Sequence, residues 1–296
     1  KFPADGSLFR SKKPIYWCNT CQTALAEVAI EYKNEASPSI YVKFPLRDSL
    51  ADEYPVLAEK KVSVVIWTTT PWTIPANLAI SLHPDFEYVA VDVGGDEVYI
   101  VAQYLAAICM EVFGIEKYSV LTQVDAKILE NKRCAHPLYD RDSLLITGEH
   151  VTLEAGTGCV HTAPGHGRED YDVGLRYDIE AYSPVDDRGR FTDDVDFFRG
   201  QFVFDANPNV IEKLKETGNL LWSGEYKHDY PLCWRPHQRP DGSVGKEPVI
   251  SRATPQWFIS MEKGDLRKKA LEEIRKCRWE PAWGEERIYG MIENRP

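Results

Sequence analysis

Two histidines and two adjacent acids stand close together in residues 156–171, with a proline and four glycines. His161, His166 and Asp170 are spaced five and four residues apart. Such residues could bind a hydrolytic metal ion, act as general bases, or present Asp170 as a fixed anion that holds an ammonium group. A helix dipole alone also favours an acid in the first helical turn. The spacing by itself therefore leaves the chemistry open.

The elements that must position these side chains follow from the turn residues. A short run of small and apolar residues ends at His161, a Pro-Gly pair follows, and acids precede the helical spacing of Tyr171–Tyr177. This order predicts a strand, a loop and the start of a helix. The polar side chains would then lie at the rim of a sheet, where a pocket could form.

A second stretch, Trp67–Asn77, carries three consecutive threonines at the end of an apolar run, followed by two prolines. Successive strand residues point to opposite faces and proline ends a strand, so hydroxyls and freed N–H groups would line a loop. A threonine run is also ordinary in a strand.

Cysteine and histidine pairs near the two ends of the chain have the spacing of metal ligands. Cys18 and Cys21 form a C-x-x-C pair, which needs two more ligands to chelate zinc. Cys233 and His237 are the candidates, and together the four would pin the chain ends around one structural ion. The alternative is two free thiols on a turn, with Cys233 packed as a small hydrophobe.

Composition limits the class of protein. The chain has 296 residues, a net charge of -11 and seven cysteines, which favours a globular protein with reduced thiols over a disulfide framework. The acidic balance argues against strong binding to a nucleic-acid backbone by this chain alone. No apolar run approaches the roughly 20 residues that cross a bilayer, and Lys1–Asp5 has no signal-peptide core. We therefore expect a cytoplasmic protein with no membrane partner.

Short apolar or alternating runs predict a curled, largely antiparallel sheet decorated by helices. A Gly-Gly-Asp turn at residues 94–96 predicts a hairpin between the last two strands. The fold class we expect is α+β, with a β-barrel-like core. The strands expected are Ile40–Phe44, Val62–Trp67, Tyr88–Val93 and Val98–Val101, and the helices are Ala102–Phe113 and Ala206–Thr217.

The two motif stretches together closely resemble the editing insertion of class I isoleucyl-tRNA synthetases. The Thr-Thr-Thr-Pro-Trp-Thr sequence favours the isoleucine enzyme over its valine and leucine relatives, which have arginine after the threonines. The resemblance covers nearly the whole chain. It rests on Trp67–Asn77 and Gly156–Tyr171, on Lys13–Cys18 with Thr23–Glu27, and on Arg252–Phe258 with Glu293–Pro296.

The resemblance implies hydrolysis of valine misattached to the isoleucine tRNA, with the 3′ acceptor end of that tRNA and the rest of the synthetase as partners. One methylene gives a pocket only roughly 1 to 3 kcal/mol of discrimination, so a second sieve is needed. The HIGH and KMSKS signatures of aminoacylation are absent. We therefore expect an excised editing domain that needs no cofactor for editing, while ATP and magnesium serve only the absent catalytic body.

Site roles follow from the resemblance residue by residue. Asp170 matches the acid that holds the α-ammonium group, and His161, with Thr73 beside it, matches the residue that crowds the side-chain pocket. The threonine-rich peptide is expected to cradle the terminal adenosine and the ester, and water is expected to attack without a protein nucleophile. The catalytic residues are predicted as Thr68, Thr69, Thr70 and Asp170, and the substrate-binding residues as Trp67, Thr73, Asn77, His161, Gly165 and His166.

Three segments are expected: an N-terminal stalk segment over residues 1–38, an editing core over 39–222, and a C-terminal stalk segment over 223–296. The two ends would pair as a small stalk of zinc-ribbon-like character. Zinc-bearing relatives tend to have a second C-x-x-C, whereas this chain has Pro236 at the fourth cysteine position, so His237 would have to substitute. Two further functions stay open: a metal-dependent hydrolase built on His161, His166 and Asp170, and a non-catalytic module that receives the acceptor end.

Overall fold

The computed structural model describes residues 2–238 and 242–293, which divide into two compact units. The larger unit spans Pro14–Ala253, and the smaller one combines Lys1–Lys13 with Thr254–Pro296. Residues 294–296, which belong to one of the matching motifs, lie outside the described residues. Among the described residues, no helix has the length and apolar character needed to span a membrane.

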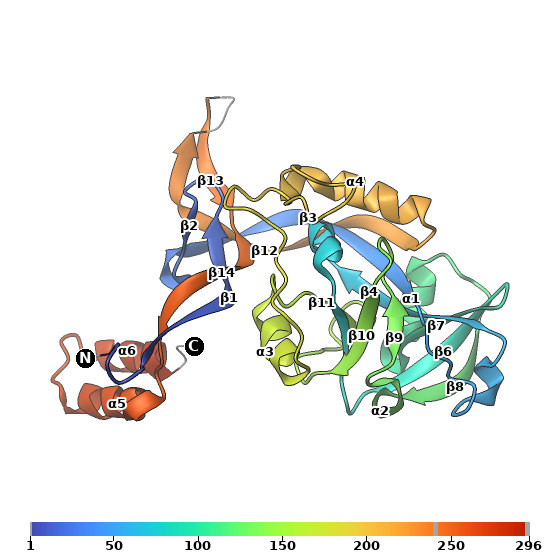
Figure 1. Cartoon of the computed structure of the whole chain (residues 1–296), viewed down its shortest axis with the longest axis horizontal. Coiled ribbons are helices and arrows are strands. Elements are labelled where there is room, and N and C mark those ends of the chain that lie inside the picture. Colours follow the sequence, from blue (N-terminus) through green and yellow to red (C-terminus); the bar gives the residue numbers. More distant parts are fainter. Residues whose placement is uncertain (1, 239–241, 294–296) are drawn as a thin grey trace. The chain divides into compact units, whose positions relative to one another are not determined.

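An eleven-stranded sheet builds most of the larger unit and curls into half a barrel, as the sequence predicted (Figure 1). Its strands run in the order β13-β12-β3-β4-β11-β5-β10-β9, with β7 beside β4, then β6 and β8. Their bounds are β3 Ile30–Pro45, β4 Lys61–Thr68, β5 Ala79–Leu82, β6 Glu87–Gly94, β7 Glu97–Ala102, β8 Ser119–Asp125, β9 Arg133–Ala135, β10 Asp142–Thr147, β11 Cys159–Thr162, β12 Leu220–Gln238 and β13 Val244–Pro248.

Strand β4 lies inside the sheet, between β3 on one side and β7 and β11 on the other. Its residues Val62–Ile66 are all buried. Because both faces of this strand are covered, its sequence does not alternate between apolar and exposed polar residues. β11 runs parallel to β4, with Val160 opposite Trp67. This pairing brings the two motif stretches side by side, so that the residues after Trp67 and after Val160 emerge at the same edge.

Helices cover the sheet where apolar spacing predicted them. The predicted helix Ala102–Phe113 appears as η4 and α1, and Ala206–Thr217 lies largely within α4, which packs against β3, β12 and η3 (Figure 1). The helical bounds in this unit are η1 Glu27–Ala29, η2 Pro55–Leu57, η3 Pro71–Ala76, η4 Gln103–Leu105, α1 Ala106–Val112, α2 Ala126–Leu129, α3 Arg168–Arg176 and α4 Val203–Glu216.

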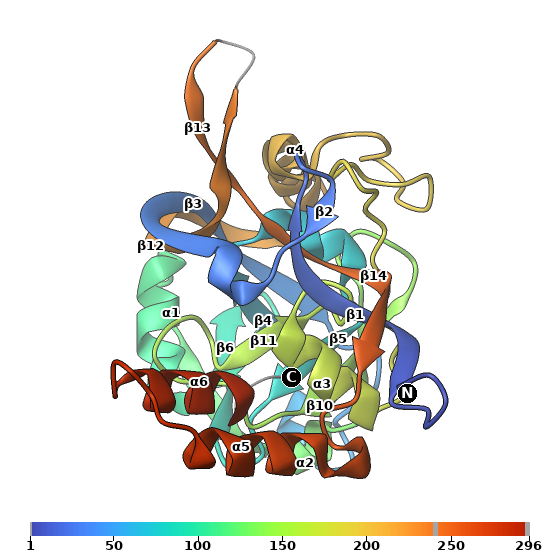
Figure 2. The same cartoon turned by 90° about the vertical axis from the view of Figure 1, so that its left-hand side faces the viewer.

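A second, three-stranded sheet has the order β14-β1-β2, with bounds β1 Leu8–Cys18, β2 Thr23–Ala24 and β14 Ile250–Ile259. The strands β3 and β12 run antiparallel over most of their length, and β13 continues along β12 (Figure 2). The predicted boundaries at residues 38 and 223 fall within β3 and β12 respectively. The division into three segments stays a prediction.

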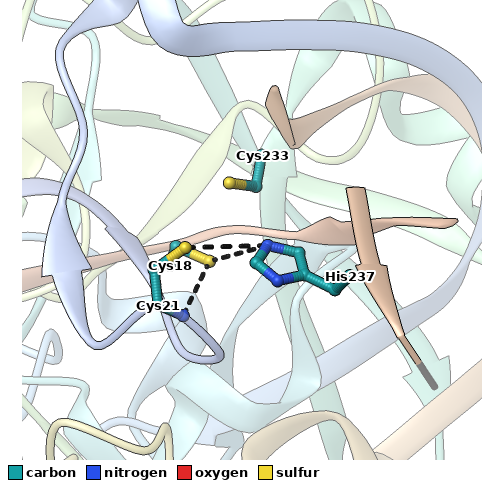
Figure 3. A group of neighbouring side chains, drawn as sticks. All are labelled: Cys18, Cys21, Cys233 and His237. Atoms are coloured by element: carbon teal, nitrogen blue, oxygen red, sulfur yellow. Dashed lines mark hydrogen bonds between the residues drawn. The ribbon is translucent and has the colours of Figure 1, made fainter. Parts of the chain in front are cut away.

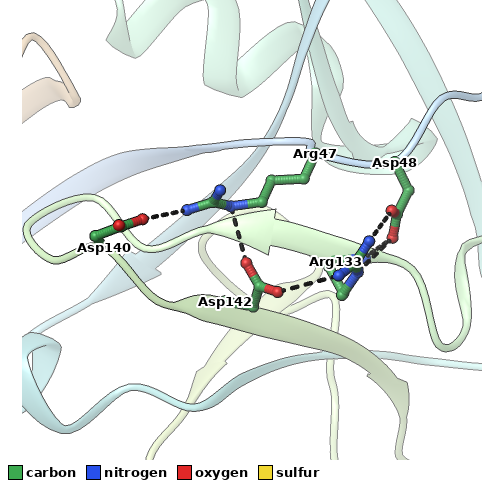
Figure 4. A network of polar contacts seen from close by, with 5 residues as sticks. All are labelled: Arg47, Asp48, Arg133, Asp140 and Asp142. Carbon is green, nitrogen blue, oxygen red and sulfur yellow. Dashed lines mark hydrogen bonds and ion pairs between the residues drawn. The ribbon is translucent and has the colours of Figure 1, made fainter.

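An ionic network ties the end of β3 to β9 and β10 (Figure 4). Arg47 contacts both Asp140 and Asp142, at 3.0 and 2.8 Å, and Asp142 also pairs with Arg133. Arg133 reaches the carboxylate of Asp48 through two guanidinium nitrogens, at 2.7 and 3.2 Å. Most of these side chains are substantially exposed, so each pair contributes at most about 1 kcal/mol.

In the smaller unit, η5 Lys263–Asp265 precedes α5 Leu266–Lys276, which lies beside α6 Gly284–Glu293. Arg267 of α5 donates to the carbonyls of Ile292 and Glu293 at the end of α6, at 2.6 and 2.7 Å. A stack of Phe9 on Phe258, with 5.8 Å between ring centroids, joins the two chain ends within this unit.

The loop before β11 turns sharply through glycines. Gly158 has φ +74°, and a Cβ there would meet Cβ of Ala102 at 2.4 Å. The carbonyl of Gly158 accepts a 2.7 Å hydrogen bond from the fully buried hydroxyl of Tyr88, which itself accepts from the N–H of His83 at 2.8 Å. Tyr88 therefore holds the backbone just before β11, the strand that carries His161.

The variant Tyr88→Phe is expected to lower the free energy of unfolding by about 1 to 3 kcal/mol, because it leaves the buried carbonyl of Gly158 and the partly buried N–H of His83 without their partner. Urea denaturation followed by circular dichroism measures the change. Tyr104→Phe is the matched control, since Tyr104 is 74% exposed. Equal stability of the two variants would contradict the assignment.

Candidate active site

A pocket of about 320 Å³ lies where the two motif stretches meet. One side comes from the end of β4, from η3, from β11 and from the start of α3. The other side comes from β1, β12 and the segment around the start of β14. The lining residues are Tyr16, Thr68, Thr70, Trp72, Thr73, His161, Ala163, His166, Asp170, His228, Asp229, Tyr230, Pro231, Val249, Ile250 and Ser251.

Its neighbours hold the His161 ring in a single neutral tautomer. Nδ1 accepts a 2.8 Å hydrogen bond from the side-chain amide of Asn77, so the proton lies on Nε2. Nε2 is 3.0 Å from Oγ1 of Thr73, and that hydroxyl donates to the carbonyl of Thr70 at 2.8 Å. Burial, with a smaller effect of His166, lowers the pKa of His161 to about 3. The ring is therefore neutral at physiological pH and locked in orientation.

The threonines at the end of β4 shape the turn into η3. Oγ1 of Thr68 accepts from the N–H of Thr70 at 3.1 Å, and the carbonyl of Thr70 accepts from the N–H of Thr73 at 3.0 Å. The side-chain oxygen of Asn207 on α4 accepts from the N–H of Trp72 at 3.0 Å. Since Pro71 and Pro75 cannot donate, such side-chain bonds complete the hydrogen bonding of this short helix.

Asp170 stands in the first turn of α3, as predicted, with Oδ2 accepting from the N–H of Ala163 at 2.9 Å. Burial raises the pKa of Asp170 to about 6, the Ala163 hydrogen bond opposes that shift, and Glu169 adds to it. A Cβ on Gly167 would come within 2.7 Å of the Asp170 carboxyl group, so glycine there leaves room for the side chain. The carboxylate faces a pocket in which its charge is poorly solvated.

His166 lines the pocket through its ring, while its Nδ1 lies 2.9 Å from the carbonyl of Ser251. The ring packs edge-on against Trp72, with centroids 4.9 Å apart. Gly165 does not line the pocket. A Cβ on Gly165 would lie 1.9 Å from the carbonyl oxygen of Tyr182, so this glycine allows two backbone segments to touch.

The structure therefore gathers six of the ten predicted residues around one pocket, namely Thr68, Thr70, Thr73, His161, His166 and Asp170. The other four lie outside its lining: Trp67, Thr69, Asn77 and Gly165. Nε1 of Trp67 donates to Oγ of Ser39 at 2.8 Å, and Asn77 is fully buried behind His161.

Sequence reasoning missed the opposite side of the pocket. His228, Asp229 and Tyr230 of β12 line it, although they are far from both motifs in the sequence. Nε2 of His228 lies 2.9 Å from Oγ of Ser37, on the facing strand β3. The order of polar and apolar residues in β12 is that of an ordinary strand in a two-stranded antiparallel pair. No local sequence signal could therefore have identified these residues.

Cys18, Cys21, Cys233 and His237 come together from distant parts of the chain (Figure 3). Their ligand atoms all lie within 4.8 Å of one another, and Nε2 of His237 is 3.6 and 3.7 Å from the sulfurs of Cys18 and Cys21. A tetrahedral zinc ion with Zn–S bonds of about 2.3 Å needs similar separations between its ligands. Three thiols and one imidazole thus fit a structural zinc ion, and they could hold it.

The elements around this cluster explain how His237 reaches it. β12 shifts register against β13 between Leu232 and Pro236, and His237 then lies opposite Gly245 of β13. On its other side, β12 places Cys233 opposite Ile30 of β3. The turn between β1 and β2 presents the two remaining cysteines, and the N–H of Cys21 donates to the sulfur of Cys18 at 3.3 Å.

Hydrogen bonds argue against a metal ion at His161, His166 and Asp170. Both ring nitrogens of His161 are already engaged, with Asn77 and Thr73, so neither is open to a metal ion. Within residues 2–238 and 242–293, the cluster of His, Cys, Asp or Glu donors close enough to share an ion is the one around Cys18. The metal-hydrolase interpretation is not supported.

We expect the purified chain to carry one zinc ion per molecule, measured by mass spectrometry of metals, because the four donors are already gathered. Cys18→Ser combined with His237→Ala should remove it and lower the melting temperature. Cys277→Ser, which changes an exposed thiol outside the cluster, is the control and should keep the metal. A metal-free wild-type chain after purification with added zinc would contradict the assignment.

Replacing Asp170 by Asn is expected to stabilise the fold at pH 7 by about 1 to 3 kcal/mol. The pKa of Asp170 is raised in the folded state, so the ionised form costs stability above that pKa and the cost shrinks as pH falls toward 4. Urea denaturation of Asp170→Asn and wild type at pH 7 and pH 4.5 measures the difference. A gain that does not depend on pH would show that Asp170 is ordinarily solvated.

Comparison with known proteins agrees with this geometry. A family model described as tRNA synthetases class I (I, L, M and V) matches residues 1–296. The isoleucine--tRNA ligases of Geobacter sulfurreducens and Nitratidesulfovibrio vulgaris are 56% and 54% identical over the whole chain, which spans 31% of each. The resemblance described from the sequence is confirmed.

Solved structures of editing domains share the fold at low identity. The GlLeuRS-CP1 structure matches with a TM-score of 0.52 at 18% identity, over 64% of this chain and 99% of that one. The Plasmodium falciparum cytosolic leucyl-tRNA synthetase editing domain matches with a TM-score of 0.51 at 10% identity, over 65% and 100%. Because the family model covers every residue, the chain belongs to the class I tRNA synthetases (I, L, M and V).

Proposed function

We propose that this chain edits misacylated tRNA by hydrolysing valine from isoleucine tRNA while excluding isoleucine. The single observation that carries the proposal is the pocket that combines the Asp170 carboxylate, the locked pair His161–Thr73 and the hydroxyls of Thr68 and Thr70. The similar isoleucine--tRNA ligases and the shared editing-domain fold support it.

Asp170 would hold the α-ammonium group of the aminoacyl ester. With a pKa of about 6, it is mostly ionised at pH 7 yet poorly solvated, so an incoming ammonium group gains a strong charge-assisted hydrogen bond. The cation in turn stabilises the carboxylate and lowers its pKa in the complex. This interaction fixes one end of the amino acid.

The His161–Thr73 pair would form the wall against the amino-acid side chain. Neither residue can turn aside without breaking hydrogen bonds, because Nδ1, Nε2 and Oγ1 are all engaged. One methylene forced against such a wall costs about 1 to 3 kcal/mol, which excludes isoleucine while valine fits.

The reaction itself would need only an oriented water molecule. Its oxygen bonds to the ester carbonyl carbon, the tetrahedral oxyanion then collapses, and the C–O bond to the ribose breaks. The water gives up one proton as it attacks and the ribose oxygen takes one up as it leaves, so free valine and deacylated tRNA result. Hydroxyls of Thr68 and Thr70 at the pocket would orient the water and donate to the oxyanion.

Aromatic residues on the opposite side of the pocket suit the terminal bases of the acceptor end. Tyr16 and Tyr230 line it, and rings of this kind stack on single-stranded bases with little dependence on sequence. With a net charge of -11, the chain would bind tRNA weakly unless the remainder of the synthetase contributes.

The broader assignments belong to the same proposal. The three segments 1–38, 39–222 and 223–296 would act as two stalk parts around an editing core in the cytoplasm. The cluster of Cys18, Cys21, Cys233 and His237 would hold a structural zinc ion, and none of these four residues lines the pocket. ATP and magnesium would serve only the aminoacylation body of the longer relatives.

We expect this chain to deacylate valyl-tRNA faster than isoleucyl-tRNA, both carried on isoleucine tRNA, by a factor of about 10 to 200, as one methylene allows. Release of radiolabelled amino acid measures both rates. A brief treatment with chelator should leave the ratio unchanged. Folded chain that hydrolyses neither substrate would favour a module that only receives the acceptor end.

The variant Asp170→Asn supplies the internal control for this experiment. It should lower kcat/KM for valyl-tRNA by about 100-fold or more, since a neutral amide no longer pairs with the ammonium group. In the wild type, kcat/KM should fall as pH drops through about 6, because protonation removes the charge of Asp170. Asp172→Asn, which changes an exposed acid of the same helix α3 outside the pocket lining, should keep both the rate and the pH profile.

A further inference from the structure

The short helix η3 depends on donors from elsewhere in the chain. Pro75 cannot donate to the carbonyl of Trp72, and the N–H of Leu78 donates to the carbonyl of Thr162 at 3.1 Å, away from η3. The carbonyl of Pro75 therefore needs a donor from outside the helix. All six residues of η3 are buried, so water cannot supply it readily.

His136, in the loop between β9 and β10, supplies one donor. Its Nδ1 accepts from the N–H groups of Leu138 and Tyr139, at 3.1 and 3.2 Å, so the ring proton lies on Nε2. Nε2 then donates to the carbonyl of Ile74 at 2.9 Å. Burial, followed by the charge of Arg141, keeps the pKa of His136 well below its usual range, so the ring stays neutral.

Arg141, from the same loop, supplies the second donor. Its Nη2 donates to the carbonyl of Pro75 and lies 3.3 Å from Nε2 of His136. The guanidinium group lies over the rings of Tyr139 and Tyr182, at 5.3 and 5.6 Å from their centroids. Two adjacent donors thus hold two consecutive carbonyls, and we name His136 and Arg141 the carbonyl clamp.

The clamped residues lie between two groups that control His161. Thr73 precedes Ile74 and contacts Nε2 of His161, while Asn77 follows Pro75 by two positions and contacts Nδ1. The N–H of Asn77 also donates to the carbonyl of Ile74 at 3.0 Å. A shift of the clamped carbonyls would therefore move both contacts of the His161 ring at once.

We propose that His136 and Arg141 are positioning residues that set the width of the amino-acid pocket, and so govern its discrimination between valine and isoleucine, by holding the carbonyls of Ile74 and Pro75. The inference rests on the proposed editing function. It differs from a merely structural role, which would lower stability and both hydrolysis rates without changing their ratio.

The test compares His136→Ala with His136→Gln in this chain. The Ala variant should reduce the ratio of kcat/KM for valyl-tRNA over isoleucyl-tRNA by about tenfold or more. A loosened wall no longer excludes the extra methylene of isoleucine, so most of the discrimination is lost. The Gln variant keeps a side-chain N–H that can reach the Ile74 carbonyl and should restore most of the ratio. An unchanged ratio in a folded Ala variant overturns the proposal.

Val124→Ala is the matched control for lost stability, because Val124 is a buried core residue of the edge strand β8. It should lower the denaturation midpoint while keeping the discrimination ratio. A ratio lost equally in this variant would mean that general loosening, and not the clamp, explains the effect.

Nitrogen NMR of the His161 ring gives a readout that needs no activity. Wild type should show the Nε2–H tautomer, and His136→Ala should shift the two ring nitrogens toward averaged values. If wild type hydrolysed neither substrate, the proposed function would fail, and this signal would still decide whether the clamp controls His161. Identical spectra for the two proteins would overturn the proposal that the carbonyl clamp controls His161.

Discussion

The parallel pairing of β11 with β4 is the constraint on which the site depends. Val160 lies opposite Trp67, so two strands separated by some ninety residues of chain end at one edge of the sheet. The first strand runs on into threonines and η3, and the second runs on through His161 into the loop that precedes Asp170. Neither segment forms a pocket of its own, because the two together supply one side while β1, β12 and the start of β14 supply the other.

Burial at this edge acts in opposite senses on two groups. It lowers the pKa of His161, which suits a rigid neutral wall, and it raises the pKa of Asp170, which leaves a carboxylate in need of a cation. The charge of Asp170 is therefore poorly compensated by the protein at neutral pH, and an ammonium group beside it would stabilise that charge. Such tension between stability and function is typical of sites that recognise charge.

Much of this site could be predicted from sequence, and the reasons are local. Prolines, glycines and apolar runs around Thr68 and His161 specify strands and turns that any fold containing them must respect. The resemblance then indicated that these two stretches meet. The roles of Trp67 and Asn77 could not be separated in this way, because both lie within the motif while only the packing shows that they face away from the pocket. His228 and Tyr230 reach the pocket because of the register in which β12 pairs with β3. His136 reaches η3 because of the path of a loop. Local amino-acid composition predicts neither a strand register nor the path of a loop.

The register of the antiparallel pair β3 and β12 fixes where each residue of β12 lies within the larger unit. The pairing runs from Leu220 opposite Val42 to Cys233 opposite Ile30, and residues 228–231, which line the pocket, lie between. Paired strands rise by about 3.4 Å per residue and alternate faces, so one deleted residue would turn every later side chain to the wrong face. A change of length between Leu220 and Cys233 would therefore displace the pocket residues of β12 and the thiol of Cys233 together. One insertion in this pair of strands would therefore alter the pocket and the four-residue cluster at once, although the two are lined by different residues.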